Sequence, residues 1–166
     1  MSFGGTIKLT GDSEYRKAIS QITSQLGVMA SEMKMVSSQY ASNNKSIESY
    51  SAKNEILSKK LSEQTNAVQI CQKAVEDFTS QQAKSKIEVE KLDKSYTEQK
   101  AKLDSMKKST NSSSKELEAQ EKIVTDLAQK LSKSSNEYDT NTTKINSRQI
   151  KLNKAQAEVY DLKNKI

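Results

Sequence analysis

Apolar side chains recur along this chain with the spacing of a heptad repeat, in which positions a and d line one face of a helix. Adding seven residues at a time from Ile19 reaches Ile166, and nineteen of these 22 a positions are apolar or tyrosine. The d positions, three residues further along, are apolar at twelve of 21. No insertion or deletion breaks the phase. Because a straight helix drifts about 20° per heptad against such a repeat, the pattern predicts a left-handed coiled coil.

Local signals place the start of the helix near Asp12. Asp12 or Ser13 can cap it, Glu14 puts negative charge in its first turn, and Gly11 marks a turn before it. No proline follows, and all four glycines lie at or before residue 27, so no strong stop signal appears later. We therefore expect one continuous coiled-coil helix over residues 12–166.

The segment 1–11 precedes this helix. Its apolar residues Ile7 and Leu9 alternate with polar ones, which predicts a short β-strand. Two apolar residues cannot stabilise a strand alone, so we expect it to pair with a partner or with neighbouring copies of itself. The sequence thus predicts an all-α fold, preceded by a short strand segment.

Two weak points interrupt the helix pattern, at 109–115 and 134–144. Both are rich in Ser, Thr and Asn, which compete for backbone hydrogen bonds. Either could form a bend or the loop of an antiparallel hairpin. The a phase continues unchanged from Leu103 to Leu117, 14 residues apart, which favours a continuous helix.

The a and d residues form the stripe along which coiled-coil helices meet, which we call the seam. They are the candidate oligomer interface, since seam side chains pack into holes on partner helices. Their chemistry is mixed and does not fix the number of strands. Apart from Ala155, the apolar and tyrosine members are Ile19, Ile22, Leu26, Met29, Met33, Val36, Tyr40, Ile47, Tyr50, Leu57, Leu61, Val68, Cys71, Val75, Phe78, Val89, Leu92, Tyr96, Leu103, Met106, Leu117, Val124, Leu127, Leu131, Tyr138, Ile145, Leu152, Val159, Leu162 and Ile166.

Three a positions are polar, namely Asn54, Gln82 and Thr110, spaced 28 residues apart. Polar layers of this kind fix register and strand number at some cost in stability; a repeated structural unit is the alternative. Cys71 is a d residue and reads as a small packing residue rather than a reactive thiol.

Composition argues against a compact globule and against most enzymes. Only 33% of the residues are hydrophobic, whereas Ser, Thr and Asn together supply 46 positions. The 27 basic and 21 acidic residues are interspersed, which is typical of a solvated helix surface and gives specific nucleic-acid binding little weight. With no histidine and one cysteine, we predict no catalytic residue, no metal site and no cofactor.

The sequence shows neither a signal peptide nor a membrane-spanning segment. The start of the chain lacks both a basic region and an apolar run of seven or more residues, and no later stretch reaches the length of a membrane span. We expect synthesis in the cytoplasm.

Three stretches resemble the amino-terminal region of tape measure proteins from tailed bacteriophages and phage-tail-like particles of Gram-positive hosts. They are TIKLTGDSEYRKAISQI, SEMKMVSSQY and SAKNEILSKKLSEQ, and the resemblance covers about residues 5–65. In that family a short strand precedes a long helix, and segments like Glu32-Met33-Lys34 and Ala52-Lys53-Asn54, followed by leucines, recur. Beyond residue 65 only the coiled-coil character agrees.

The resemblance implies a structural function and no enzyme activity. Tape measure proteins of contractile and non-contractile tails lie along the tail lumen, set tube length during assembly and are released on ejection. It further implies a parallel homo-oligomer with three copies favoured, contacts with tail tube and tail tip or baseplate proteins, and a place inside the virion or bacteriocin-like particle after assembly in the host cytoplasm. The alternatives are a cellular coiled-coil spacer or scaffold and a DNA-associated helical protein.

Overall fold

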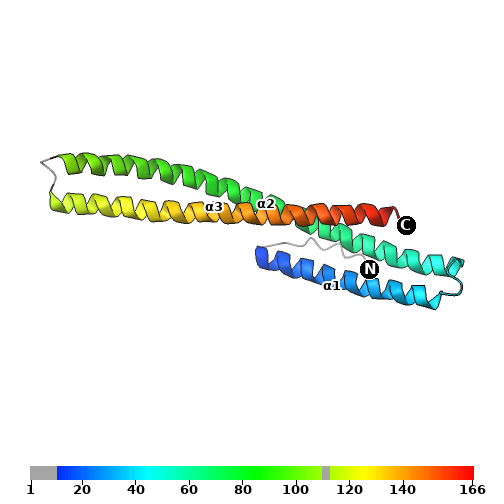
Figure 1. Cartoon of the computed structure of the whole chain (residues 1–166). Helices are drawn as coiled ribbons and strands as arrows, with labels where there is room; N and C mark the ends of the chain where they lie inside the picture. Colours follow the sequence, from blue (N-terminus) through cyan, green and yellow to red (C-terminus); the bar gives the residue numbers. More distant parts are fainter. Residues whose placement is uncertain (1–10, 110–112) are drawn as a thin grey trace. The chain divides into compact units, whose positions relative to one another are not determined.

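A computed structural model describes residues 11–109 and 113–166 as three α-helices (Figure 1). They are α1 (Asp12–Gln39), α2 (Ile47–Lys108) and α3 (Ser114–Lys163). The described residues contain no strand, and the expected strand segment at 1–11 lies outside them except for Gly11, which forms a bend. Gly11 precedes α1 with a φ of 116°, a conformation that disfavours residues with a side chain.

The prediction of one long helix in a parallel oligomeric coiled coil is wrong. Two breaks divide the expected helix, and the helices pack on one another within the same chain. A seam pattern records which face of a helix is covered, and it does not record whether the covering helix belongs to another chain or to the same one. The a and d residues therefore face other helices as predicted, but these helices belong to the same chain.

The first break lies between Gln39 and Ile47, inside a segment for which an unbroken repeat predicted helix. The side-chain oxygen of Ser46 accepts a hydrogen bond from the backbone N–H of Ser49 at 3.1 Å, which caps the start of α2. Three further turn hydrogen bonds join residues of the 38–46 segment, such as the one from Asn43 N to Tyr40 O at 3.0 Å. Local capping chemistry thus outweighs the repeat here.

The second break separates α2 from α3 at the weak point 109–115. A capping box starts α3: the Glu116 carboxylate accepts from the Ser113 backbone N–H at 2.9 Å, and the Glu116 N–H donates to the Ser113 hydroxyl at 3.3 Å. The other weak point, 134–144, stays helical inside α3. Its threonine hydroxyls donate to carbonyls one turn back, as Thr142 does to Tyr138 at 3.0 Å.

The chain divides into two units, which share the long helices. Unit 1 contains the chain up to Glu76 together with Asn146–Ile166, so it holds α1, the first part of α2 and the last part of α3. Its core brings together all three helices through Tyr15, Ile22, Ala67, Ile70, Cys71, Ala74, Leu152 and Ala155. Small residues on α2 let the other helices approach closely.

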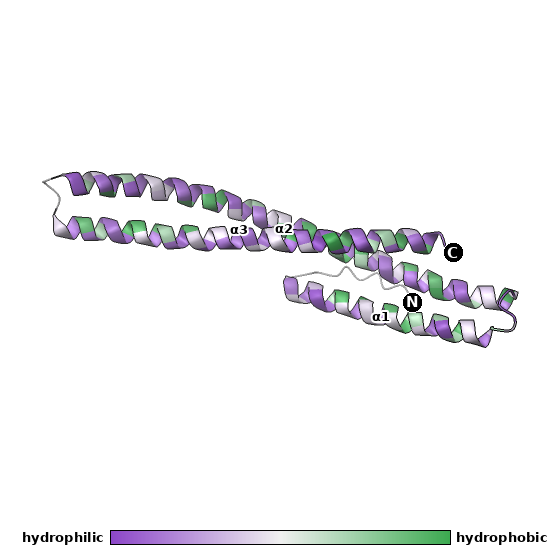
Figure 2. Cartoon of the chain, viewed as in Figure 1, coloured by the Kyte–Doolittle hydropathy of each residue, from purple (hydrophilic) through white to green (hydrophobic). Residues whose placement is uncertain are grey.

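Unit 2 is Asp77–Ile145, an antiparallel hairpin formed by the rest of α2 and the first part of α3 (Figure 1). Among the described residues of this unit, only Phe78, Leu103, Gln120 and Asn141 are buried; the other described a and d residues are half-buried, except Ser113, which is exposed. Figure 2 shows apolar residues recurring at intervals among polar ones along both helices. Two helices alone cannot enclose a core, so unit 2 is held by a single seam.

Candidate functional site

Polar side chains meet across the seam of the unit 2 hairpin. The Gln120 amide donates to the backbone oxygen of Gln99 at 3.0 Å and to its side-chain oxygen at 2.9 Å. Gln120 is 4% exposed, so these bonds satisfy a buried amide. The polar d positions therefore match one another across the hairpin instead of remaining unpaired.

A second polar cluster crosses the same seam nearer the open end of unit 2. Gln82 donates to the Thr142 hydroxyl at 2.6 Å, and Asn141 donates to the Ser85 hydroxyl at 3.5 Å. Next to them, the Lys144 ammonium lies 5.0 Å from the centre of the Phe78 ring, in cation–π distance. These contacts fix the register of the two helices with little apolar burial.

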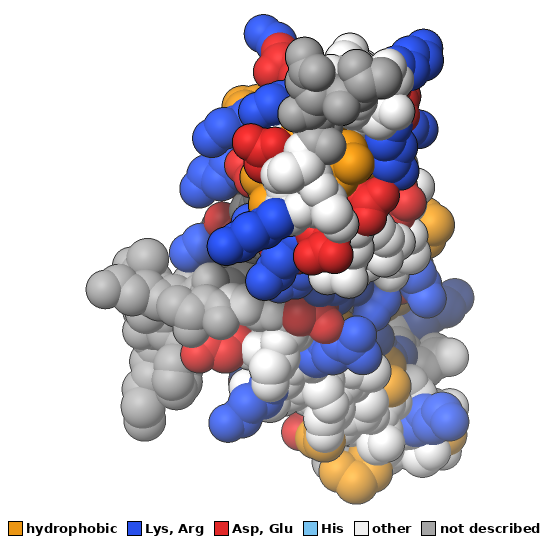
Figure 3. Space-filling view, turned by 90° about the vertical axis from the view of Figure 1, so that its left-hand side faces the viewer, with side chains coloured by type: hydrophobic (Ala, Val, Ile, Leu, Met, Phe, Trp, Pro, Cys, Tyr) orange, Lys and Arg blue, Asp and Glu red, His pale blue; other side chains and the backbone are white. Residues whose placement is uncertain are grey.

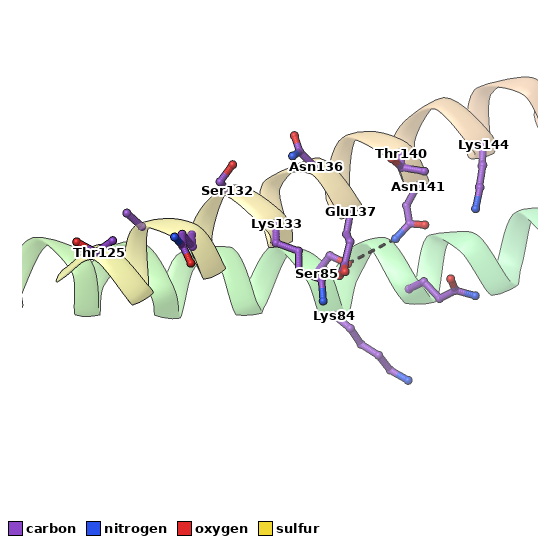
Figure 4. A pocket seen from close by; sticks show the side chains of 13 residues that line it. Lys84, Ser85, Thr125, Ser132, Lys133, Asn136, Glu137, Thr140, Asn141 and Lys144 are labelled. Carbon is purple, nitrogen blue, oxygen red and sulfur yellow. Dashed lines mark hydrogen bonds between the residues drawn. The ribbon is translucent and has the colours of Figure 1, made fainter. Parts of the chain in front are cut away.

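A groove of about 980 Å³ lies along this polar seam, between α2 and α3. Figure 4 shows its lining: α3 contributes most side chains, and α2 contributes Lys84 and Ser85 among others. In this view Lys84 extends away from α3, whereas Lys144 points toward α2. Short side chains such as Ser132 leave the space that a leucine would fill.

The groove offers amide, hydroxyl and ammonium groups and little apolar surface. Lys84, Lys133 and Glu137 are all exposed, so the site does not exclude water from a reacting group. The chemistry of the groove fits polar contacts with another surface.

Unit 1 contains a buried polar cluster around Tyr15. The Arg148 guanidinium pairs with the Asp12 carboxylate and lies 4.1 Å from the centre of the Tyr15 ring. Arg148 is only 5% exposed, and the Tyr15 hydroxyl lies 3.6 Å from the Cys71 sulfur. The cluster thus ties the first turn of α1 to α2 and α3.

Burial and charge act in opposite directions on the titrating groups of this cluster. Burial alone would raise the pKa of Asp12, but the hydrogen bond from Arg16 and the charge of Arg148 outweigh it and hold that pKa below its ordinary value. Burial, followed by the hydrogen bond with Cys71, raises the pKa of Tyr15. Tyr15 therefore stays a neutral phenol, and Asp12 stays charged near neutral pH.

The structure places most of the predicted seam residues in contacts within the chain. Five are buried: Ile22, Cys71, Phe78, Leu103 and Leu152. The half-buried ones are Ile19, Leu26, Met29, Met33, Val36, Tyr40, Leu57, Leu61, Val68, Val75, Val89, Leu92, Tyr96, Met106, Leu117, Val124, Leu127, Leu131, Tyr138, Ile145, Val159 and Leu162. The exposed ones are Ile47 at 83%, Tyr50 at 57% and Ile166 at 49%.

The three polar a positions have different surroundings. Gln82 is half-buried and paired with Thr142, Asn54 is exposed, and Thr110 lies outside the described residues. Cys71 is a free, buried thiol. Its neighbours are core residues of unit 1, in keeping with a packing role.

The heptad pattern did not identify the polar partners that stabilise each unit. Tyr15 and Arg148 both occupy d positions, and neither was weighed as a structural residue. A signal existed in the mirror arrangement of polar d residues on either side of the 109–113 segment, Gln99 and Gln120 being nearly equidistant from it. Such symmetry is expected of an antiparallel hairpin.

Charged side chains of both signs are interspersed over the face seen in Figure 3. Among residues 11–109 and 113–166, no three metal-binding side chains gather closely enough to hold an ion. No helix in these ranges has a segment both long and apolar enough to span a bilayer. On this face the charges form no single binding patch.

Comparison of this chain with protein-family models, with curated proteins and with solved structures finds no match.

Proposed function

We propose that this chain is a structural, non-catalytic part of a phage or phage-like tail, the amino-terminal region of a tape measure protein. The observation that carries the proposal is the resemblance of residues 5–65, through TIKLTGDSEYRKAISQI and the two stretches after it. The helical hairpin and the water-exposed groove are compatible with a structural role. Tail tube and tail tip or baseplate proteins are the proposed partners, and the tail lumen is the proposed location.

The fold changes how such a segment contributes length. In an extended helix every residue adds about 1.5 Å to the distance spanned. In the unit 2 hairpin, two residues on opposite arms share each step along the axis, so each residue contributes half as much. If unit 2 measures length, each residue removed from the hairpin should therefore shorten the tail by about half of 1.5 Å.

A paired deletion tests this role. Removing 90–103 from α2 and 119–132 from α3 deletes two heptads from each arm, preserves both seam phases and removes segments that face each other. Tails should shorten by about 21 Å, whereas a fully extended chain would shorten them by about 42 Å. Tail length is measured on electron micrographs of particles assembled with the variant.

Removing 90–103 alone is the matched control. It leaves 14 residues of α3 without a partner arm, so it should impair assembly for a reason unrelated to length. Normally assembled tails of unchanged length with the paired deletion would contradict the measuring role. The absence of tail tube and baseplate genes beside the coding sequence would favour a cellular coiled-coil spacer instead.

A further inference from the structure

The first turns of α2 present an uncovered stretch of the same seam that α3 covers further along the helix. Ile47 is 83% exposed and Tyr50 57% exposed, although both occupy seam positions. Asn54 is also exposed and Leu57 is half-buried. We call these four residues the open seam.

The open seam follows from where α3 ends. In unit 1, Leu152 and Ala155 of α3 join a cluster with Ile70, Cys71 and Ala74 of α2. Because the two helices are antiparallel, Leu162, ten residues further along α3, lies opposite Leu61. α3 ends at Lys163, so no described residue of α3 reaches the face that carries Ile47 and Tyr50.

α1 does not cover the open seam because it packs on a different side of α2. The buried residues of α2 nearest its start are Ser49 and Ile56, seven residues apart, which lie on a face rotated from that of Ile47 and Leu57. The two stripes of α2 serve two different neighbours. Beside the first turns of α2, α1 is present and α3 is not.

We propose that the open seam binds the open seam of a second copy of this chain, related by a two-fold axis near Ala52. In an antiparallel helix pair, a positions face d positions, so Ile47 would pack on Leu57 of the second copy and Tyr50 on Asn54. The four residues form a self-complementary set, as an isologous interface requires. Each copy then supplies the helix that the other lacks.

Two further features favour a second copy over an unrelated helix. In the dimer, the side chain of Asn54 can form a hydrogen bond with the Tyr50 hydroxyl of the second copy, whereas an all-apolar helix would offer no such partner. On one flank of the open seam, Ser51 and Ser58 are small, uncharged and exposed, so close approach on that side of the two-fold axis meets no charge repulsion. The interface is short, and we expect a weak, concentration-dependent dimer.

Substitution of exposed residues tests the proposal without disturbing the fold. Ile47→Glu should weaken dimerisation by about tenfold or more, because it places a charge against the apolar Leu57 of the second copy. Ile87→Glu is the matched control, since Ile87 is 66% exposed and lies in unit 2. Sedimentation equilibrium over a concentration series measures the association, and circular dichroism shows that both variants keep their helix content.

Cross-linking tests the two-fold geometry. A Ser51→Cys variant should form a disulfide-linked dimer on mild oxidation, because the two copies of residue 51 lie beside the axis. Ser58→Cys should not, since antiparallel pairing separates its two copies by roughly 18 Å along the helices. A monomer at every concentration, or equal cross-linking of both variants, would overturn the proposal.

Discussion

At the scale of single residues, an ion pair between the buried Arg148 and the half-buried Asp12 connects the start of α1 to α3. Asp12 and Arg148 are 136 residues apart in the sequence, and the Arg148 side chain also packs on the Tyr15 ring. Removing one member of such a pair leaves the other charge poorly solvated. The pair therefore contributes to holding unit 1 together and does so only while Asp12 is ionised.

We predict that Arg148→Met lowers the free energy of unfolding by roughly 1–3 kcal/mol. The methionine fills much of the same space but leaves the Asp12 carboxylate with Arg16 as its remaining partner. Urea denaturation followed by circular dichroism measures the change. Arg16→Met is the control, because Arg16 is 73% exposed and its loss should cost much less.

The lowered pKa of Asp12 gives unit 1 a defined pH dependence. A carboxyl group with a folded pKa below its unfolded value stabilises the fold above the unfolded pKa, near 3.9, and loses that contribution as pH falls through the folded pKa. Stability should therefore fall on acidification below about pH 4. Asp12→Asn should flatten this part of the profile; an unchanged profile would show that Asp12 contributes nothing.

At the scale of helices, the unit 2 seam is held by matched polar residues as well as by apolar ones. Gln99 and Gln120 face each other, so replacing either one removes the side-chain partner of the buried Gln120 amide or of the half-buried Gln99 amide. Replacing both by apolar residues removes the desolvation cost and adds apolar burial.

We predict that Gln99→Leu/Gln120→Leu raises the melting temperature relative to either single variant. The double variant should be roughly 1 kcal/mol more stable than the sum of the two single effects predicts, since each single variant leaves the other amide without its side-chain partner. Thermal melts of the four proteins complete the double-mutant cycle. Additive effects would mean that the two amides do not interact.

The helical state and the seam phase were predictable from the sequence, because the repeat of a and d residues such as Val89, Leu92 and Tyr96 reports a covered helix face. The break between α2 and α3 falls at the weak point 109–115, where a hairpin loop was one alternative, whereas the break between Gln39 and Ile47 was not predicted. The capping box of Ser113 and Glu116 and the Ser46 cap are local signals that compete with a repeat continuing in phase on both sides. The repeat also carries no information on whether the covering helix belongs to the same chain, so Arg148 and Tyr15 were not recognised as partners.

At the scale of the whole chain, the central claim is that α2 and α3 form an antiparallel hairpin within one molecule. Lys84 and Glu137 line the same groove, although 53 residues separate them in the sequence. Both are exposed, so cysteines introduced there accept spin labels without disturbing the seam. The distance between the two labels distinguishes a hairpin from an extended helix directly.

The measurement is an electron–electron distance on Lys84→Cys/Glu137→Cys in a Cys71→Ala background, diluted with unlabelled protein so that only distances within one molecule contribute. The hairpin predicts a distance on the order of 20 Å, allowing for the label linkers and a helix separation of about 10 Å. A continuous helix would place the two positions about 80 Å apart. A narrow short distance supports the antiparallel hairpin, and its absence from the diluted sample would contradict it.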